Sequence, residues 1–451
     1  MLLKKTQKQR SAVHTIVIAY FLVIFIVTVL LILPISLKPG ASLSFTDALF
    51  VSASAVSVTG LTTINTAATF SGFGTIVLMI AFQVGGIGIM AMGTFYWILF
   101  GKPIGLSQRK MMMIDQNRYN LSGMVQLMKL IIGMTLLFEG VGALLFGGYF
   151  YFAGYYDTLY RAMYHGLFHA VSSYTNAGFD LFGNSLLDYS DDVVVQLLTM
   201  LLIVLGAIGF PVIAEVREYL FGGHKRFRFT LYTKVTTTTF AILLLLGAAG
   251  IWITEGSNTF EGMAWYEKVL NAFFASITSR SAGLATIDPS KMTDASQLLL
   301  AVLMFIGASP SSMGGGVRTT TVAIIVLMII TFMRGEEEIR VFGRSVRHED
   351  IIKSFLFFIT GVLLVMIGIF VVLISESPHV PAIAVIFEVC SAFGTCGLST
   401  GITGSLSWAS KVALIVLMYI GRIGMTQFLT LFVSRKAKAD VHYPEERLII
   451  G

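Results

Sequence analysis

Four loops along the chain carry the residue types from which proteins build sites for dehydrated cations. Each loop contains a glycine, and a phenylalanine stands ten positions before it, with mostly small or hydroxyl residues between the two. The pairs are Phe50 and Gly60, Phe168 and Gly178, Phe273 and Gly283, and Phe387 and Gly397. Backbone carbonyl oxygens in such loops can replace the hydration shell of an ion, and glycine permits close approaches that a Cβ would block. The pattern therefore indicates coordination of a cation by the backbone.

The candidate ion-binding residues are the glycine of each loop and the two residues before it. They are Val58, Thr59, Gly60, Asn176, Ala177, Gly178, Ser281, Ala282, Gly283, Thr395, Cys396 and Gly397. A helix from Phe50 to Gly60 would be about 16 Å long, or half a bilayer. Its carboxyl end would point a partial negative charge towards the centre of the protein, which favours a cation. Two roles stay open for the Asn176 side chain: it supplies an oxygen ligand, or it braces its loop, which we favour.

The composition indicates that membrane helices position these loops. The 451 residues are 55% hydrophobic and 12% charged, with a mean hydropathy of +0.81, whereas soluble domains carry about 25% charged residues. Eight apolar stretches are long enough to cross a membrane, at 13–35, 75–100, 125–152, 193–220, 231–254, 297–333, 351–374 and 409–433. Short helices are expected at 50–60, 159–174, 268–278 and 385–393. The sequence predicts an all-α integral membrane protein.

The predicted chain consists of four tandem units, each a span, a short pore-type helix, a glycine loop and a second span. This gives eight transmembrane helices. The units are 13–100, 125–222, 229–334 and 350–434, between tails at 1–12 and 435–451.

The distribution of Lys and Arg predicts the orientation. Of 31 such residues, 22 fall in five segments, at 1–10, 101–122, 217–234, 334–353 and 435–451. The positive-inside rule places these segments, and so both termini, in the cytoplasm. The protein is then a multi-pass protein of the plasma membrane whose glycine loops face outwards. The net charge of +6 is explained without nucleic-acid binding.

A second glycine motif recurs in the span after each loop. It reads VGGIG (84–88), LGAIG (205–209), IGASP (306–310) and IGRIG (420–424), and close helix packing is the favoured interpretation for three of the four. In the third copy, Pro310 and three consecutive glycines cannot continue an ordinary helix. We prefer a flexible gate loop inside the membrane to a simple kink. Its residues are Gly307, Ala308, Ser309, Pro310, Ser311, Ser312, Met313, Gly314, Gly315 and Gly316.

Ionisable residues at membrane depth are functional candidates. Arg280, just before the third loop glycine, and Glu388, on the fourth short helix, are predicted to pair behind the loops. Arg422 either donates hydrogen bonds to carbonyls of the gate loop or raises the barrier to cations. Glu139 is a coupling residue or, as we favour, a packed and hydrogen-bonded one.

The sequence lacks the motifs of enzymes. It has no Walker motif, no GxGxxG after a soluble strand, no phosphorylation stretch of the DKTGT kind, no catalytic triad and no metal cluster. Cys390 and Cys396 are interpreted as small apolar fillers. Because the cytoplasmic segments are short, regulation requires a separate partner. The segment 334–353, with five basic and five acidic residues, is a docking surface or a plain solvated face.

The four loops resemble those of the ion-translocating subunit of the Trk/Ktr/HKT potassium transporter superfamily, with the bacterial Ktr type most similar. The segments concerned are SVTGL (57–61), TNAGF (175–179), SRSAGL (279–284) and FGTCGL (393–398). The resemblance implies one selectivity filter around one central pore in each subunit, an intramembrane gate loop and a homodimer. It also implies regulation by a cytosolic octameric ring of RCK-type nucleotide-binding domains, so that ATP and ADP bind only the partner.

The transported ion implied by the resemblance is K⁺, with Na⁺ as a possible activator or symported ion and with no covalently bound cofactor. Glycine in all four loops is the family pattern for potassium, whereas serine in the first loop is linked to sodium permeation, so Gly60 favours potassium. Cys396 departs from the aliphatic residue expected there. The alternatives are a sodium-permeable member of the same family and a secondary transporter with broken helices. An intramembrane hydrolase would need convergent catalytic pairs, and none is evident.

Overall fold

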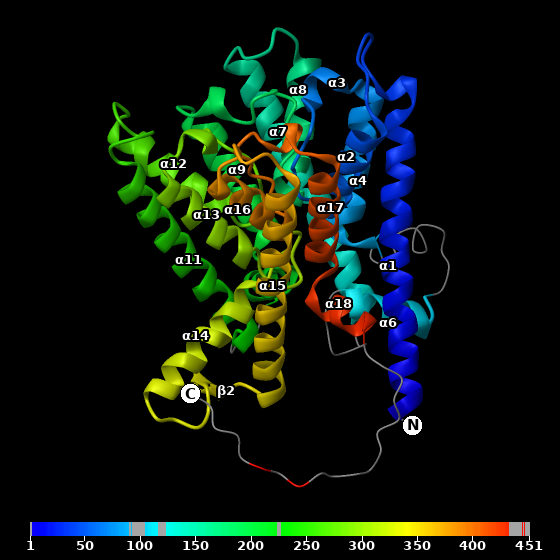
Figure 1. Ribbon diagram of the computed structural model, residues 1–451, viewed down its shortest axis with the longest axis vertical. Coiled ribbons are helices and arrows are strands. Elements are labelled where there is room, and N and C mark those ends of the chain that lie inside the picture. Colours follow the sequence, from blue (N-terminus) through cyan, green and yellow to red (C-terminus); the bar gives the residue numbers. More distant parts are fainter. Residues whose placement is uncertain are drawn as a thin grey trace.

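The computed structural model describes residues 2–89, 92, 104–115, 123–222, 227–432, 444 and 446, and these are mostly helical (Figure 1). The helices are α1 (Leu2–Ile32), α2 (Phe45–Ser57), α3 (Thr66–Thr69), α4 (Gly72–Ile87), α6 (Leu106–Asp115), α7 (Met124–Phe152), α8 (Leu159–Thr175), α9 (Val193–Ala207), α10 (Phe210–Phe221), α11 (Leu231–Glu255), α12 (Trp265–Thr278), α13 (Asp294–Ile306), α14 (Thr319–Met333), α15 (His348–Ser375), α16 (Ala382–Phe393), α17 (Trp408–Ile423) and α18 (Met425–Leu431). Strands β1 (Arg340–Val341) and β2 (Arg344–Ser345) form an antiparallel hairpin within the expected cytoplasmic segment 334–353. Most of the C-terminal tail, and residues 101–103 and 116–122 of the basic link, lie outside the described residues.

Four helices of the described part are long and apolar enough to cross a membrane: residues Val13–Ile32 of α1, and the whole of α7, α11 and α15. They coincide with the first span expected in each of the four units. Their outward faces carry large apolar side chains, such as Leu363 and Phe370 of α15, which are 57% and 67% exposed. A surface of this kind suits contact with lipid rather than water.

The four short helices α2, α8, α12 and α16 lie where the sequence predicts them, within about three residues at most ends. They have between 12 and 17 residues, too few to be continuous spans. Hydroxyl caps begin two of them, Ser44 on α2 and Thr158 on α8. All four lie in the upper half of Figure 1, and their last residues are buried. The helices therefore enter the protein from one side and end inside it.

The second spans are broken rather than continuous. Helices α9 and α10 meet at 102° and α17 and α18 at 106°, next to Gly209 and Gly424, which have φ of 99° and 89°. Residues 307–318 separate α13 from α14, as the gate-loop prediction requires. Helix α4 ends before Gly88, φ 99°, and the rest of the expected span 75–100 lies largely outside the described residues. The expectation of single continuous spans at 193–220 and 409–433 is therefore wrong, and the reason is a glycine with positive φ, a conformation that L side chains rarely adopt.

The first glycine of the second motif packs a broken helix against a short helix. A Cβ on Gly85, Gly206 or Gly421 would collide with the carbonyl oxygen of Val56, Tyr174 or Phe393, respectively. Each of these carbonyls lies four residues before a loop glycine. The interpretation of these glycines as sites of close helix packing is confirmed, although the last glycine of the same motif also breaks the helix.

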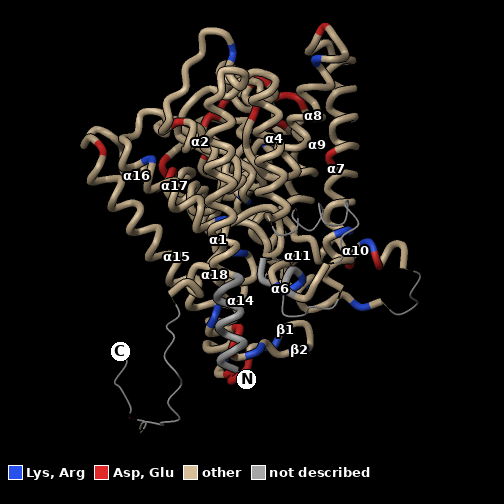
Figure 2. Tube along the Cα trace, turned by 90° about the vertical axis from the view of Figure 1, so that its right-hand side faces the viewer, with Lys and Arg blue, Asp and Glu red and all other residues tan. Residues whose placement is uncertain are grey.

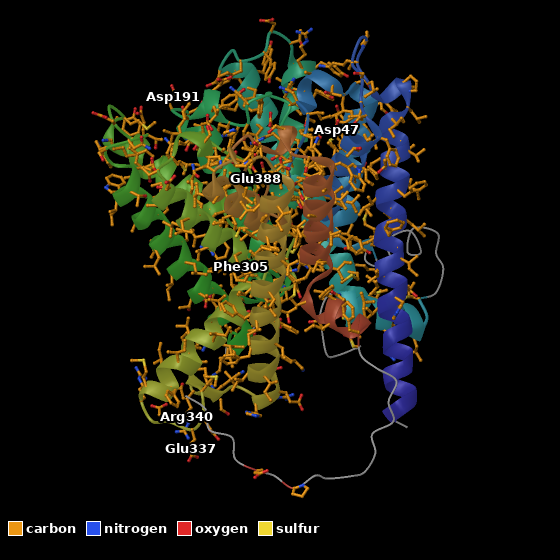
Figure 3. The ribbon with its side chains drawn as sticks, in the orientation of Figure 1. Asp47, Asp191, Phe305, Glu337, Arg340 and Glu388 are labelled. Carbon is orange, nitrogen blue, oxygen red and sulfur yellow. The ribbon has the colours of Figure 1, made fainter. Side chains whose placement is uncertain are left out.

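Charged residues concentrate at the two ends of the molecule. Figure 2 shows Lys, Arg, Asp and Glu mainly in the end loops, with a largely uncharged region between them. Glu337 and Arg340 mark the lower end in Figure 3, whereas Glu388 lies in the upper half among the short helices. The few charges at middle depth are therefore exceptional and need an explanation from their contacts.

Candidate functional site

At or just after the end of each short helix, one residue adopts the same unusual backbone conformation. Val58, Asn176, Ser281 and Thr395 have φ of 57°, 58°, 72° and 46°, and each lies two positions before a loop glycine. This left-handed region is uncommon for residues other than glycine and costs free energy. Four equivalent occurrences show that the loops share one backbone geometry. Strain of this kind persists only where the surrounding structure enforces it.

Three of the helices close with the same hydrogen bonds. Thr59, Ala177 and Cys396 each donate their N–H to the carbonyl five residues earlier, at 2.8 Å in every case. This is the bond of a Schellman motif, which turns the chain sharply at a helix end. The N–H groups of the loops thus point back into the helices. The carbonyl groups of the loops take no part in these bonds.

The four loop glycines form a closed ring. A Cβ on Gly60 would lie 2.7 Å from the carbonyl oxygen of Ala177, and one on Gly178 would lie 2.8 Å from that of Ala282. In the same sense, Gly283 faces the carbonyl of Cys396, and Gly397 faces that of Thr59. The contacts run from the first loop to the second, third and fourth, and back to the first. Loops up to about 340 residues apart in sequence are thereby brought around one axis.

All twelve predicted site residues are buried in this ring. Among the described residues, none donates a hydrogen bond to any of their carbonyl oxygens. Buried carbonyls are rarely left unpaired in proteins, so twelve at one place indicate a ligand other than the protein. Carbonyl oxygens carry a partial negative charge, and the ligand that they suit is a cation.

Hydroxyl side chains of the short helices hold the loops from behind. Ser54 and Ser391 accept a hydrogen bond from the N–H of Gly60 and Gly397, each at 3.0 Å. Ser172 and Thr278 instead donate to the carbonyls of Phe179 and Leu284, each at 2.6 Å. Those carbonyls belong to the residue just after the loop glycine. The hydroxyl residues noted in the sequence therefore fix the loop backbone.

The predicted gate loop lies against the ring. Gly315 donates its N–H to the hydroxyl of Ser281 at 3.2 Å, and that hydroxyl donates to the carbonyl of Gly394 at 2.7 Å. A Cβ on Gly314 would lie 2.6 Å from the Cβ of Ser281. Residues of the third and fourth loops thus contact the two glycines directly.

The other side of the gate loop is fixed to the break between α9 and α10. Met313 donates its N–H to the carbonyl of Gly206, and Ser309 donates to Ala207, both at 3.1 Å. The hydroxyl of Tyr232 donates to the carbonyl of Pro310 at 2.6 Å. The helix break therefore supplies polar backbone groups at the depth where the loop needs partners.

Two arginines hold the loop in place. Arg422 donates to the carbonyl of Met313 in the loop and to the carbonyls of Gly85 and Gly86 on α4. Arg318 donates to the carbonyl of Ser309 at 3.3 Å and to that of Gly314. For Arg422, the hydrogen-bonding role is therefore observed. The sequence analysis gave Arg318 no role, although its place two residues after the three glycines was a signal.

A cavity of about 390 Å³ lies beyond the gate loop. Pro310, Ser312, Arg318, Arg422 and Asp350 of α15 are among the residues that line it. No residue of the glycine ring lines this cavity. The gate loop therefore borders the ring through Ser281 and borders this cavity through Pro310 and Ser312.

The predicted pair between Arg280 and Glu388 does not form. Glu388 accepts hydrogen bonds from Ser399 at 2.6 Å and from Thr403 at 2.9 Å, so its carboxylate is satisfied within its own unit. The Arg280 guanidinium is fully buried, makes no hydrogen bond to a described residue, and lies 6.0 Å from the ring centroid of Phe240. The prediction failed because residue spacing does not show which way a buried side chain points.

Two further expectations about side chains can be compared with the contacts. The amide of Asn176 makes no hydrogen bond to a described residue, so the bracing contact that we favoured is not found. The Cys396 thiol lies 3.3 Å from the carbonyl of Thr278 and is fully buried, as expected of a small filler. Cys390 is a buried free cysteine as well.

The chain is similar to known transport proteins over nearly its whole length. The family described as TrkH, cation transport protein, matches residues 2–440. The chain is 46% identical over 441 residues to Ktr system potassium uptake protein D of Bacillus subtilis strain 168, covering 98% of this chain and 97% of that protein. It is 34% identical over 453 residues to the potassium/sodium uptake protein NtpJ of Enterococcus hirae, with 99% of both chains covered.

The crystal structure of the potassium transporter TrkH from Vibrio parahaemolyticus has a similar fold. Its TM-score is 0.72 at 18% sequence identity, and the match covers 94% of this chain and 85% of that one.

Proposed function

The chain belongs to the TrkH cation transport family, and on this premise we propose that it takes up K⁺ through the ring of four glycine loops. In this proposal the twelve buried carbonyls form one selectivity filter. The four units, each with two membrane crossings, surround a single pore. The observation that carries the proposal is the closed ring of loops whose carbonyls have no donor among the described residues. Four helix ends with partial negative charge converge on the same place, which favours a cation further.

The gate loop, residues 307–316, is proposed to control permeation. It packs against Ser281 and the fourth loop on one side and adjoins the cavity on the other. Arg318 and Arg422 hold it with hydrogen bonds to its carbonyls. Opening requires that these bonds exchange for others, so a partner that stabilises the open arrangement can regulate flux.

The subunit is proposed to work as a homodimer with a cytosolic regulatory ring. The relative from Bacillus subtilis is named as a protein of a Ktr system, which implies a further component for that protein. The ring is proposed to be octameric, of the RCK type, and to bind ATP and ADP itself. The five Lys- and Arg-rich segments, including 334–353, would face it from the cytoplasm together with both termini.

Sodium enters the proposal as an activator or a symported ion. The relative from Enterococcus hirae is named a potassium/sodium uptake protein. A sodium-permeable pore is therefore the second candidate function. Gly60, without a side chain in the ring, supports potassium as the main ion.

Growth rescue and rubidium uptake test the proposal. The chain is expressed in a bacterium that lacks its own potassium uptake systems, with and without a cytosolic ring subunit. We expect Rb⁺ uptake that saturates, is inhibited by K⁺ and increases when the ring is present. Na⁺ uptake that K⁺ does not inhibit would replace potassium with sodium as the transported ion. Absence of Rb⁺ and Na⁺ uptake, with the protein present in the membrane, would contradict the proposal.

A further inference from the structure

An apolar groove of about 500 Å³ runs between α9 and α12. The side chains that line it are all aliphatic, aromatic or methionine side chains. Leu197 and Leu201 of α9 form its rim and are 53% and 55% exposed, whereas Met200 and Ile277 lie deeper and are 7% and 6% exposed. The groove is therefore open along the surface that these helices present to the membrane.

The length of the groove matches one leaflet of a bilayer. Trp265 and Tyr266, in the first turn of α12, line one end of it, and Ile277, in the last turn, lines the other. The 14 residues of α12 rise about 21 Å, and half of the hydrocarbon core is about 15 Å thick. Trp and Tyr are typical of the boundary between hydrocarbon and headgroups, and these two are 75% and 46% exposed. The groove therefore extends from the headgroup region to the middle of the membrane.

Two carboxylates lie at the headgroup end of the groove. Glu267 follows Tyr266 directly and accepts a hydrogen bond from its hydroxyl at 3.2 Å. Asp191 is exposed and lies at the upper end of the molecule in Figure 3. Its neighbour Ser190 accepts a hydrogen bond from the side-chain amide of Asn271 on α12 at 3.1 Å, which joins the start of α9 to α12. Both carboxylates are therefore placed beside the mouth of the groove.

These charges identify the class of headgroup. Acyl chains alone give no selectivity, because lipid tails are as apolar as the leucines around them. None of the lining residues is basic, and among the described residues neither carboxylate forms an ion pair. A primary ammonium group donates hydrogen bonds to carboxylates and balances their charge. A choline group has no N–H to donate, and an anionic headgroup would be repelled.

We propose that this groove binds one phospholipid whose headgroup carries a primary ammonium, as in phosphatidylethanolamine. One acyl chain lies between α9 and α12, and the ammonium group lies at Asp191 and Glu267. The chain reaches Ile277, which directly precedes Thr278, whose hydroxyl holds the carbonyl of Leu284 after the third loop. A bound lipid therefore supports that loop from the membrane side. Binding is independent of transport, and only an effect of the lipid on flux rests on the proposed function.

The test is thermal unfolding of the purified chain in detergent with increasing phosphatidylethanolamine, phosphatidylcholine or phosphatidylglycerol, all with the same acyl chains. We expect phosphatidylethanolamine to raise the unfolding temperature with a saturable midpoint at least fivefold lower than those of the other two lipids, since one charge near a membrane surface is worth about fivefold. The double substitution Asp191→Asn and Glu267→Gln should remove this difference. Asp288→Asn is the control, because that carboxylate already lies 4.0 Å from Lys291, and its midpoints should not change.

A second pair of variants tests the groove itself. Leu201→Trp places a larger side chain at the rim and should raise the phosphatidylethanolamine midpoint tenfold or more. Leu363→Trp is the matched control, since Leu363 is a similarly exposed leucine on α15, outside the groove. Its midpoint should not change.

Three results would overturn the proposal. The first is equal midpoints for the three lipids, and the second is a preference for phosphatidylethanolamine that survives loss of both carboxylates. If the carboxylate variant does not fold, an unchanged midpoint in Leu201→Trp overturns the proposal equally. The third is a Leu201→Trp chain that binds lipid as before but changes from dimer to monomer, which would assign the groove to contact between two copies. Absence of Rb⁺ uptake by the natural chain would instead contradict the proposed function and leave the lipid site standing.

Discussion

At the scale of single residues, the proposed filter depends on backbone conformation more than on side chains. The residues in the left-handed region are a valine, an asparagine, a serine and a threonine, which share no chemical group. What they share is a position two residues before a glycine that meets the next loop. A conformation that side chains disfavour is thus held at four places by contacts between the loops. The ring is therefore sensitive to any atom added at its glycines.

Gly60→Ser should weaken the preference for K⁺ over Na⁺. The new Cβ would lie 2.7 Å from the carbonyl oxygen of Ala177 and must displace it. A displaced carbonyl alters the coordination of the larger ion, and a loss of about 1.4 kcal/mol corresponds to a tenfold decrease in preference. The measurement is competition between Rb⁺ and Na⁺ uptake. Gly40→Ser is the matched control, since Gly40 has φ of 82° and nothing within 4 Å of a Cβ. Equal effects of the two substitutions would remove Gly60 from the filter.

Arg422→Met should raise uptake in the absence of the ring subunit. The substitution removes the hydrogen bonds to Met313 and to two carbonyls of α4. Bonds from charged donors contribute about 1.5–3 kcal/mol each, so a gate loop held by them should open at least tenfold more often without them. Rubidium uptake at equal protein level is the measurement. Arg422→Lys separates charge from hydrogen bonding, because lysine keeps the charge without the fork. If Arg422→Lys takes up Rb⁺ at the rate of the natural chain, the positive charge at this position, rather than the hydrogen bonds of the guanidinium, limits the flux.

The sequence predicted the identity of the residues at the candidate site better than it predicted their contacts with one another. The glycines that form the ring could be found because their spacing repeats, and Arg422 because its charge is conspicuous at membrane depth. The partners of Arg280 and Glu388 could not, since Glu388 is satisfied by hydroxyl groups that follow the fourth loop. Hydroxyl residues are common in loops, and nothing in their spacing shows which of them faces a carboxylate.

At the scale of elements, one design recurs in the four second spans. Each runs past a short helix and then stops, at Gly88, Gly209, Gly307 or Gly424, with φ between 68° and 99°. The gate loop occupies the third of these positions, and its backbone bonds to the second. The third break could be predicted because proline and consecutive glycines cannot continue an ordinary helix. The breaks at Gly209 and Gly424 could not, because an isolated glycine in an apolar helix more often marks close packing.

Deletion of Ser311–Gly315 should increase Rb⁺ flux and make it less dependent on the ring subunit. It removes the loop segment between the filter and the cavity, with the hydrogen bond from Met313 to Gly206. A second variant guards against a general loss of structure. Tyr232→Phe removes the 2.6 Å hydrogen bond to Pro310, worth about 1 kcal/mol, so flux should rise about fivefold. Flux equal to that of the natural chain in both variants would exclude the gate role.

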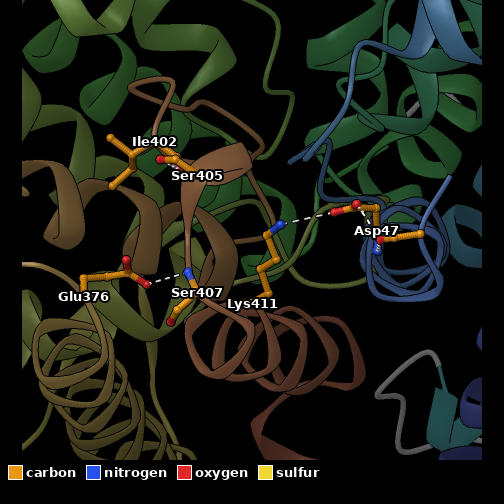
Figure 4. A network of polar contacts seen from close by, with 7 residues as sticks. Asp47, Glu376, Ile402, Ser405, Ser407 and Lys411 are labelled. Atoms are coloured by element: carbon orange, nitrogen blue, oxygen red, sulfur yellow. Dashed lines mark hydrogen bonds and ion pairs between the residues drawn. The ribbon is translucent and has the colours of Figure 1, made fainter. Parts of the chain in front are cut away.

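At the scale of the whole molecule, the ring requires that the first unit meets the last. On the side where the short helices begin, Lys411 of α17 and Asp47 of α2 form an ion pair at 3.2 Å (Figure 4). Glu376, just after α15, accepts a hydrogen bond from the N–H of Ser407 at 2.8 Å and holds the start of α17. Burial opposes ionisation of Asp47, but hydrogen bonds from Ser44 and Lys411 hold its pKa below the ordinary value. This contact joins residues 364 positions apart in sequence.

A double-mutant cycle on Asp47 and Lys411 should show that this pair closes the ring. Asp47→Asn and Lys411→Met should each lower the thermal unfolding temperature. The double variant should unfold at a temperature no lower than that of the less stable single variant. Because the side chains are only 23% and 13% exposed, a coupling of about 1 kcal/mol is expected, at the upper end for surface pairs.

A group whose pKa is lowered on folding stabilises the protein above its unfolded pKa, here near 3.8. The difference between the natural chain and Asp47→Asn should therefore diminish as the pH falls through and below that value. The exposed pair of Asp288 and Lys291 provides the control, since its charges lie 4.0 Å apart in one short segment and should show no coupling. Equal coupling in both pairs, or additive effects at Asp47 and Lys411, would show that packing of the loops alone closes the ring.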